Sequence, residues 1–461
     1  GEGNLGNNTE NEVQDFTKMP EQIPIPKGKD LITAVGPGLV LAMTFLGTGD
    51  LVSSSVSGAN YGYTLIWSLV LALLARTFIV SAIAKYTLLN RFGDTQILEG
   101  YRRLFKFFPL FLAVVVLIAG FVIQSMFLKA CATGFYQLTG GNWGGEYGTF
   151  ISAIIVMVFT IFLVASKKQF KLFEYIARAA SVTMIVFFVI ALFQIGHFDV
   201  AGFLKGLFTF QVTAEDQSGV FGPLVVACAT IGSVAGNMPN LLYSGFMRDK
   251  GWSGPRYRKL QQLDLITGMA PLFIINILFW AVAAEHVHAG GGSISDEFDM
   301  ANMMADIMGP IGPFVLWLCI FCAAITSFPT QTRGFAQLAI SGLHLGTKGE
   351  EKWKGRDEED PWFKRIQMVV FTIVPIVASL PAAPNMVVLN IIGTSLCTSI
   401  SLPFIVVGLI WLTSSKKYMM DCAVNKKWET AILVFLGIIA FVITIQLIPQ
   451  LPGMFIDAFA Q

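Results

Sequence analysis

The chain has 461 residues, of which 54% are hydrophobic and 13% are charged, whereas soluble globular chains carry about 25% charged residues. Its formal net charge of +1 gives no reason to expect a nucleic-acid partner. The sequence contains no hydrolase triad, Walker loop or zinc-ligand spacing. These features predict an integral membrane protein and argue against an enzyme.

Residues 1–30 are polar, acidic and rich in asparagine, which predicts a flexible cytoplasmic tail and not a signal peptide. Apolar runs then follow one another, so we expect one transmembrane domain over residues 31–450. A bilayer core about 30 Å thick requires about 20 apolar residues per helix. Eleven runs are long enough: 32–58, 63–89, 108–136, 148–166, 172–195, 219–247, 262–284, 310–343, 365–382, 386–413 and 428–450. Residues 451–461 are predicted to form an extracellular tail.

The loops between the runs alternate in charge. Lys205 is the only basic residue of one set of loops. The other set holds clusters of Lys and Arg near residues 91–106, 167–171, 248–259, 348–365 and 416–427. Because basic loops stay in the cytoplasm, we expect a multi-pass protein of the cell membrane with a cytoplasmic N-terminus and an extracellular C-terminus. An odd number of spans agrees with this orientation.

The first run is interrupted by the motif Gly47-Thr48-Gly49-Asp50. Unsatisfied backbone groups in hydrocarbon are costly, so a helix breaks at membrane depth only where it is buried in protein or lines a cavity. Asp50 is the only acidic residue that we place near the middle of a span, and an ionisable residue there indicates a functional site. For this motif alone, a simple helix kink is the structural alternative.

The sixth run contains a second interruption, Gly232-Ser-Val-Ala-Gly-Asn-Met-Pro-Asn240. Pro239 removes a helical donor, and the two glycines weaken the preceding turn. Breaks in the first and sixth runs predict two five-helix repeats of opposite topology, and such paired breaks mark the midplane binding site of a transporter. The predicted repeats cover about 31–195 and about 219–413, with an extra helix at about 428–450.

Basic residues inside the apolar runs include Arg76, Lys129 and Arg333. Lys129 or Arg333 could supply a counter-charge to an acidic site. The alternative is that these long side chains extend toward the membrane surface, where the charged group is hydrated.

The stretch GPGLVLAMTFLGTGDLVSSSVSGANYGYTLIW resembles the first helices of the Nramp divalent-metal transporters. Those helices typically carry Gly-Pro-Gly, then Asp-Pro-Gly-Asn, then a run of small residues. The stretch FKLFEYIARAASVTMIVFFVIAL and residues 399–404 extend the resemblance, which covers about residues 31–450. It implies an all-α membrane protein with the LeuT-type 5+5 inverted repeat, eleven transmembrane helices, and breaks in helices one and six.

The metal-binding residues of the family are altered in this chain. Aligned on Gly49, the family's aspartate falls at Gly47 and its asparagine at Asp50, so the carboxylate is displaced by three residues. In the sixth helix the family reads Ala-x-x-Met-Pro-His-Asn. An ungapped alignment places Ser233 at the alanine, which ligates metal through its carbonyl, and Gly236 at the methionine.

A second alignment of the sixth helix, with one residue deleted, matches Met238-Pro239 to the family's Met-Pro and leaves Asn240 at its asparagine. The choice affects the substrate, because a thioether favours transition metals whereas oxygen ligands suit Mg²⁺, Ca²⁺ or Mn²⁺. Without the methionine, a wider pocket could hold Mg²⁺ with several of its waters. In this respect the chain is similar to the Nramp-related magnesium transporters.

The ungapped alignment predicts one set of site residues. The cation would bind at Asp50, Gly47, Thr48, Ser233, Gly236, Asn237, Thr394 and Ser395, with Gly49 and Pro239 at the helix breaks. We expect no cofactor beyond the transported cation, no partner apart from that cation and the lipid bilayer, and a chain that can act as a monomer.

The family's proton-path acids in the third helix fall at Gln124 and Phe127, and its sixth-helix histidine falls at Met238. None of these residues exchanges a proton near neutral pH, so we expect transport of a divalent cation, Mg²⁺ first, without proton coupling. The alternatives are an Nramp-type carrier of Mn²⁺ or another transition metal, a carrier of a non-metal solute on the same fold, and a sensor that does not transport.

Overall fold

The computed structural model describes residues 16–35, 48–165, 167–212 and 219–460. Within these ranges the chain is nearly all helical, and an isolated bridge between Asn90 and Met419 is the β pairing found there. Ten helices of the described part are long and apolar enough to cross a membrane. The first predicted span is represented by α2 (Thr48–Tyr61), because residues 36–47 lie outside the described ranges.

The other helices follow the predicted spans closely, and short helices occupy the loops. The long helices are α3 (Ile66–Leu89), α5 (Phe108–Leu138), α6 (Gly148–Ala165), α7 (Lys167–Ile195), α11 (Arg258–Ala283), α13 (Gly312–His344) and α18 (Lys427–Leu447). The ninth span consists of α15 (Pro361–Arg365), a π-helix (Ile366–Ile373) and a 3-10 helix (Val374–Ser379). The loop helices are α4 (Ile97–Leu104), α8 (Val200–Thr209), α12 (Glu297–Met308) and α14 (Gly349–Lys352).

The sixth span is broken, as the sequence predicts. Helix α9 (Pro223–Val234) ends before a 3-10 segment, η2 (Met238–Leu242), which leads into α10 (Tyr243–Asp249). Pro239 lies in the first turn of η2, where its missing N–H costs little.

The tenth span is also interrupted, which the sequence analysis missed. Helix α16 (Met386–Ile400) ends at Ser401, whose φ of −123° is not helical, and α17 (Leu402–Ser414) then begins. Pro403 in the first turn of α17 explains the break, because a proline ring clashes with the carbonyl of the preceding turn.

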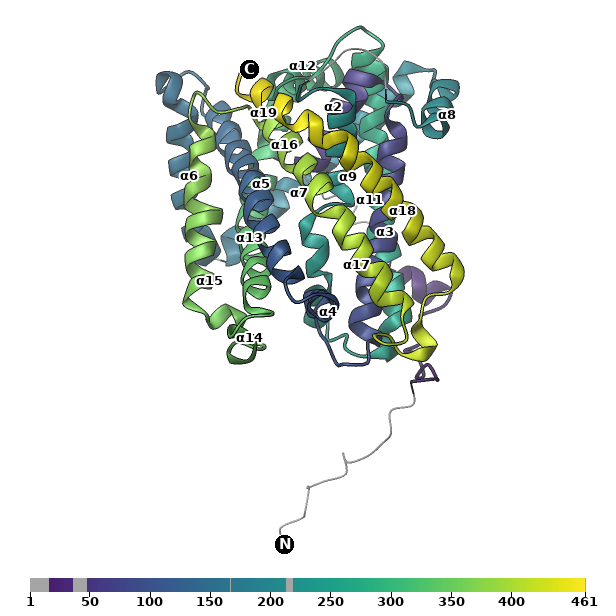
Figure 1. Cartoon of the computed structure of the whole chain (residues 1–461). Helices are drawn as coiled ribbons and strands as arrows, with labels where there is room; N and C mark the ends of the chain where they lie inside the picture. The colour runs from purple at the N-terminus through teal and green to yellow at the C-terminus, as the bar shows by residue number, and fades with distance from the viewer. Residues whose placement is uncertain (1–15, 36–47, 166, 213–218, 461) are drawn as a thin grey trace.

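The helices form two groups that share α16 (Figure 1). In one group α2 packs against α9 and α11, and α3 packs against α9 and α11. In the other group α5 and α13 pack along each other, with α6 and α7 beside them. Helix α16 joins the groups by contacting both α9 and α5. At its crossing with α9, a Cβ on Gly232 would lie 1.8 Å from the Thr394 carbonyl oxygen, so only glycine permits this approach.

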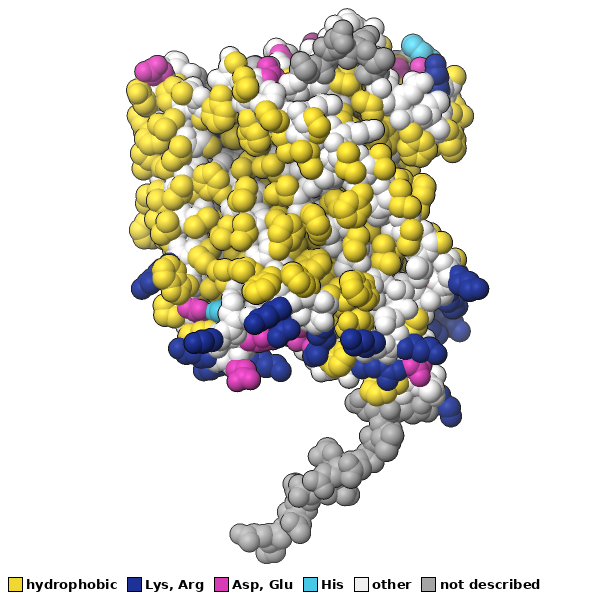
Figure 2. Space-filling view, viewed as in Figure 1, with side chains coloured by type: hydrophobic (Ala, Val, Ile, Leu, Met, Phe, Trp, Pro, Cys, Tyr) yellow, Lys and Arg dark blue, Asp and Glu magenta, His cyan; other side chains and the backbone are white. Residues whose placement is uncertain are grey.

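The surface has an apolar belt between two polar ends (Figure 2). Large apolar side chains such as Phe193, which is 81% exposed, and Phe162, which is 69% exposed, form the belt. Lys and Arg gather at one end, which also carries α4 and α14, whereas the C-terminal helix α19 (Leu451–Ala460) lies at the other end (Figures 1 and 2). This arrangement is that of a helical bundle embedded in lipid.

Both predicted tails differ from the structure where it describes them. Ile23 N–H donates to the Arg256 carbonyl at 3.0 Å, Cys422 N–H donates to the Phe16 carbonyl at 3.1 Å, and Phe16 lies under the Arg91 guanidinium. Residues 16–23 are therefore anchored to the basic end, because loops distant in sequence supply partners for their backbone.

The predicted C-terminal tail is helical. After Pro449 a single 3-10 turn leads into α19, and the Asp457 carboxylate accepts a hydrogen bond from Val220 N–H at 3.0 Å. The contact ties α19 to the residues just before α9.

We expect the basic end to face the cytoplasm, because positively charged loops are retained there. In a Cys422→Ser background, a membrane-impermeant maleimide should label a cysteine at Asn142 in intact cells and one at Lys348 only after permeabilisation. Both positions are exposed; Asn142 lies in the loop between α5 and α6, and Lys348 directly precedes α14 at the basic end. The background protein without an added cysteine is the control, and the opposite labelling pattern would overturn the orientation.

Candidate functional site

The first turn of α2 presents polar groups that have no partner among the described residues. The Thr48 hydroxyl is buried and unpaired. The side chain of Asp50 follows in the same turn and is partly accessible. Gly47, which was predicted to belong to the site, lies outside the described residues. Thus two of the predicted side chains, Thr48 and Asp50, do lie together at the start of α2.

Asn390 of α16 is a site residue that the sequence analysis did not identify. It is 1% exposed, and its Nδ2 donates to the Ser53 hydroxyl at 3.0 Å. Its Oδ1 is buried, has no partner among the described residues and lies 3.7 Å from where a Cβ on Gly49 would be. An unpaired buried amide oxygen beside this turn is a candidate cation ligand. The sequence contained one weak indication of this role, because an asparagine inside an apolar span needs hydrogen-bond partners.

The remaining hydroxyls of the small-residue run hold α2 in place. Ser54 donates to Asn276 Oδ1 of α11 at 2.8 Å, and the Ser57 and Thr230 hydroxyls share a hydrogen bond of 3.0 Å between α2 and α9. These bonds fix the position of the first turn of α2 relative to the broken sixth span.

The break in the sixth span is stabilised by a side-chain amide. Asn240 Nδ2 donates to the carbonyl oxygens of Val234 at 3.1 Å and Ala235 at 3.3 Å. Backbone carbonyls at the end of a helix have lost their helical donors, and leaving them unpaired in an apolar region is costly. By pairing these two carbonyls, Asn240 allows α9 to end inside the apolar part of the bundle.

The other predicted residues of the sixth span have different surroundings. The Ser233 hydroxyl donates to the Thr230 carbonyl at 2.9 Å, so it is turned back onto its own helix. Gly236 is buried against the backbones of Gly232 and Cys397. Asn237 lines a cavity.

That cavity has a volume of about 410 Å³. The break residues line it on one side, and Phe246 and Asp264 line it toward the basic end. Arg76 of α3 also lines it. The volume is sufficient for several water molecules at about 30 Å³ each. The cavity thus gives the break an aqueous space on the side of the basic end.

The hydroxyls of Thr394 and Ser395 are already occupied. Thr394 donates to the Asn390 carbonyl at 2.6 Å, and Ser395 donates to the Val225 carbonyl of α9 at 3.2 Å. The Thr394 hydroxyl is thus turned onto its own helix, and the Ser395 hydroxyl joins α16 to α9. Asn390, one turn before Thr394, lies beside the start of α2 instead.

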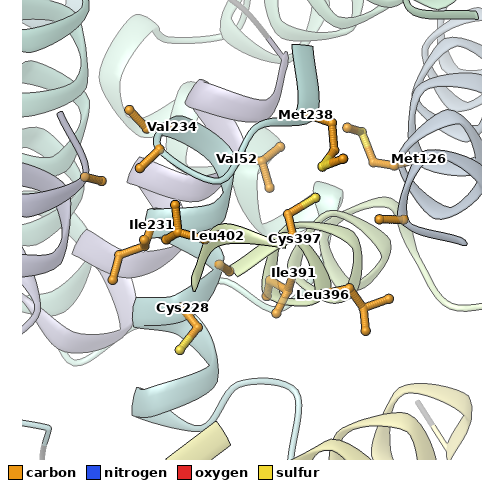
Figure 3. Close-up of a cluster of buried hydrophobic side chains, with 14 of the residues drawn as sticks. Val52, Met126, Cys228, Ile231, Val234, Met238, Ile391, Leu396, Cys397 and Leu402 are labelled. Carbon is orange, nitrogen blue, oxygen red and sulfur yellow. The ribbon is translucent and has the colours of Figure 1, made fainter. Parts of the chain in front are cut away.

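Sulfur-bearing side chains also surround the break. Met238 is 1% exposed and belongs to a buried cluster with Val52 of α2, Met126 of α5 and Cys397 of α16 (Figure 3). Whichever alignment of the sixth helix is used, a thioether therefore lies next to α2.

Comparison with known proteins identifies the chain at this point. A family model described as natural resistance-associated macrophage protein-like matches residues 38–450. The chain belongs to the Nramp family.

The individual relatives are distant but extend over the whole chain. The divalent metal cation transporter MntH of Levilactobacillus brevis is 22% identical, with 96% of this chain and 94% of that protein covered. The MntH of Brucella suis is 24% identical, with 92% and 89% covered. A crystal structure of a variant manganese transporter from Eremococcus coleocola has a TM-score of 0.62 at 17% identity, covering 96% of this chain and 92% of that one.

This chain has the LeuT-type fold of the Nramp transporters, as predicted. The relatives are named as transporters, which agrees with the prediction that the chain is not an enzyme.

Gln124 occupies the position that the Nramp resemblance assigns to a proton-path acid. Its Nε2 donates to the carbonyl oxygens of Phe328 and Phe371, both at 3.1 Å, and to the Thr332 hydroxyl. The amide thus connects α5, α13 and the ninth span, and its role in the structure is to pair buried carbonyls.

The three basic residues singled out in the spans have different environments. The Arg333 guanidinium is exposed and pairs with Glu358 at 2.9 Å, as expected for a side chain that extends to the surface. Lys129 donates a hydrogen bond at 2.6 Å to the carbonyl of Pro384, in the loop before α16. It also attracts the buried carboxyl of Glu297 in α12 electrostatically. Burial raises the pKa of the Glu297 carboxyl, and the positive charge of Lys129 opposes this rise. Arg76 alone interacts electrostatically with Asp50.

Asn240→Leu should lower the thermal stability of the detergent-solubilised protein, because two carbonyls at the end of α9 lose their donor. The expected loss is about 1–3 kcal/mol. Asn237→Leu is the matched control, since that side chain faces the cavity and makes no hydrogen bond within the described residues. Equal melting temperatures for the two variants would contradict this role of Asn240.

Proposed function

We propose that this protein is an alternating-access carrier for a divalent metal cation. The observation that carries the proposal is the carboxylate of Asp50 in the first turn of α2, a helix that packs against α9 of the broken sixth span. An ionisable group is retained at such a position for function, because burying it is costly. The names of the relatives, divalent metal cation transporters, support a metal ion as the substrate.

The donor set favours Mg²⁺. It consists of the Asp50 carboxylate and the oxygens of Thr48 and Asn390 that have no partner among the described residues. In the described parts of the chain no three His, Cys, Asp or Glu side chains cluster as a metal site. Mg²⁺ dehydrates reluctantly and is bound through few carboxylates while it keeps several waters. One carboxylate and neutral oxygens suit this ion, and no other cofactor is proposed.

Transport is proposed to be uncoupled from protons. Gln124, Phe127 and Met238 stand where the Nramp resemblance expects titratable groups, and the Nε2 of Gln124 pairs buried carbonyl oxygens. The four histidines of the sequence, at positions 197, 286, 288 and 344, are all outside the first, third and sixth spans. The gradient of the cation itself would then drive its inward movement.

Manganese is the second candidate substrate, and Met238 is the observation that favours it. A thioether buried beside α2 could contribute a soft ligand, which transition metals accept and Mg²⁺ does not. The structural relative is named as a manganese transporter.

Variants of α2 and α16 test the site in proteoliposomes. Asp50→Asn should abolish Mg²⁺ flux, because the only carboxylate of the site is lost. Asn390→Leu should raise KM about tenfold, as expected when one polar ligand is removed. Thr394→Val, one turn away on the same helix, should remain within about twofold of the parent protein, because its hydroxyl serves its own helix. Similar losses in Asn390→Leu and Thr394→Val would contradict the assignment of Asn390.

Flux as a function of pH and cation tests coupling and substrate. We expect Mg²⁺ uptake to vary little between about pH 6.5 and about pH 8, with no acidification of the vesicle lumen. Met238→Leu should preserve Mg²⁺ flux and lower any Mn²⁺ flux. Uptake of Mn²⁺ alone, accompanied by lumen acidification, would instead establish the proton-coupled transition-metal carrier.

A further inference from the structure

Arg76 is a half-buried arginine that the proposed function leaves unexplained. It is the eleventh residue of the 24-residue helix α3, so it lies near the middle of the span. It lines the cavity together with Asn237, Pro239 and Asn240 of the broken span. Its Nε is buried and has no hydrogen-bond partner among the described residues.

A second arginine near the same helix shows what a structural arginine looks like here. Arg258 of α11 donates to the Ser81 carbonyl at 2.9 Å, to the Ser81 hydroxyl at 3.1 Å and to Gln261 Oε1 at 2.7 Å. Its donors hold α11 against α3. Within the described ranges Arg76 makes no such bonds, so packing of helices does not account for it.

The electrostatic partner of Arg76 is Asp50. Helices α2 and α3, which carry Asp50 and Arg76, both pack against α9 of the broken span. Each of the two charges acts on the other across this packing, although no direct ion pair joins them in the described part of the chain. Charges in a low-dielectric interior interact strongly over several ångströms. Removing either one would leave the other uncompensated.

We infer that Arg76 is a resident counter-charge that neutralises Asp50 when the carrier is empty and is displaced from it when a cation binds. The inference rests on the proposed function. A divalent cation at Asp50 repels the guanidinium, which can turn on its flexible stem toward the part of the cavity lined by Asp264. When the cation leaves, Arg76 again compensates Asp50.

The charge balance gives this arrangement a purpose. Asp50 and Arg76 together are neutral, so the empty site can reorient through the apolar core without an uncompensated carboxylate. The guanidinium also competes with the cation, which weakens binding and speeds release. Arg76 therefore lowers affinity and supports the return of the empty carrier, which net uptake requires and cation exchange does not.

Two flux modes of the full chain in proteoliposomes separate these effects. Net uptake is measured as Mg²⁺ entry into magnesium-free vesicles, and exchange as isotope entry into Mg²⁺-loaded vesicles. Arg76→Gln should lower the KM for Mg²⁺ about tenfold and net uptake about tenfold, while exchange stays within about twofold of the parent protein. Arg76→Lys, which keeps the charge, should retain net uptake. Arg333→Gln is the matched control at an exposed ion pair and should change neither mode.

The outcomes distinguish this inference from the proposed function. If the parent protein moves neither Mg²⁺ nor Mn²⁺, the proposed function fails. If the parent protein transports and Arg76→Gln lowers exchange and net uptake equally, or raises KM, Arg76 is not a counter-charge. If the parent carries Mn²⁺ instead, the same two modes are measured with Mn²⁺. Arg76→Met is a second variant that removes the charge and fills similar space, should Arg76→Gln fail to fold.

Discussion

The architecture of this protein depends on one constraint, that backbone groups released by a broken helix must find partners inside an apolar belt. The sixth span meets it with few residues. Ala235 and Gly236 N–H both donate to the Ile231 carbonyl, and the Asn240 amide pairs the next carbonyls along the helix. Because Gly232 has no side chain, α16 approaches α9 closely there. The polar turn can therefore exist at membrane depth, because most of the backbone groups that the break releases are hydrogen-bonded.

Buried polar side chains have different roles in this protein. Ser54, Ser57 and Ser395 have partners on neighbouring helices and fix the relative positions of the spans. Oxygens of Thr48 and Asn390 and the Nε of Arg76 have none among the described residues, and the same is true of buried atoms elsewhere, such as the Oε1 of Gln124. Buried polar groups without partners are rare in native proteins, and a ligand or water commonly completes them. Thr48 and Asn390 are candidates for the site because they also lie at or beside the first turn of α2, which carries Asp50.

The sequence predicted much of the fold and part of the site. Hydropathy placed the spans to within a few residues, and Pro239 with its flanking glycines placed the sixth break. The tenth break was missed, although Pro403 signalled it. The flexible-tail prediction was wrong for residues 16–23, since segments far away in sequence supply their partners. Residues 451–460, predicted only as an extracellular tail, form the helix α19. Asn390 was overlooked in favour of Thr394 and Ser395, because hydroxyls on one helix look equivalent until the neighbours of each are known.

By itself the sequence determined the spans, the charge asymmetry of the two ends and the presence of one carboxylate in the first broken run, because each is a property of a short stretch. The free energy of moving a side chain from water to lipid depends on that residue and its near neighbours in the chain, and so does the helix-breaking effect of proline. Only the tertiary structure decided which buried groups are paired. The Ser53–Asn390 and Ser54–Asn276 bonds, and the interaction of Asp50 with Arg76, join different helices whose faces meet only in the folded bundle.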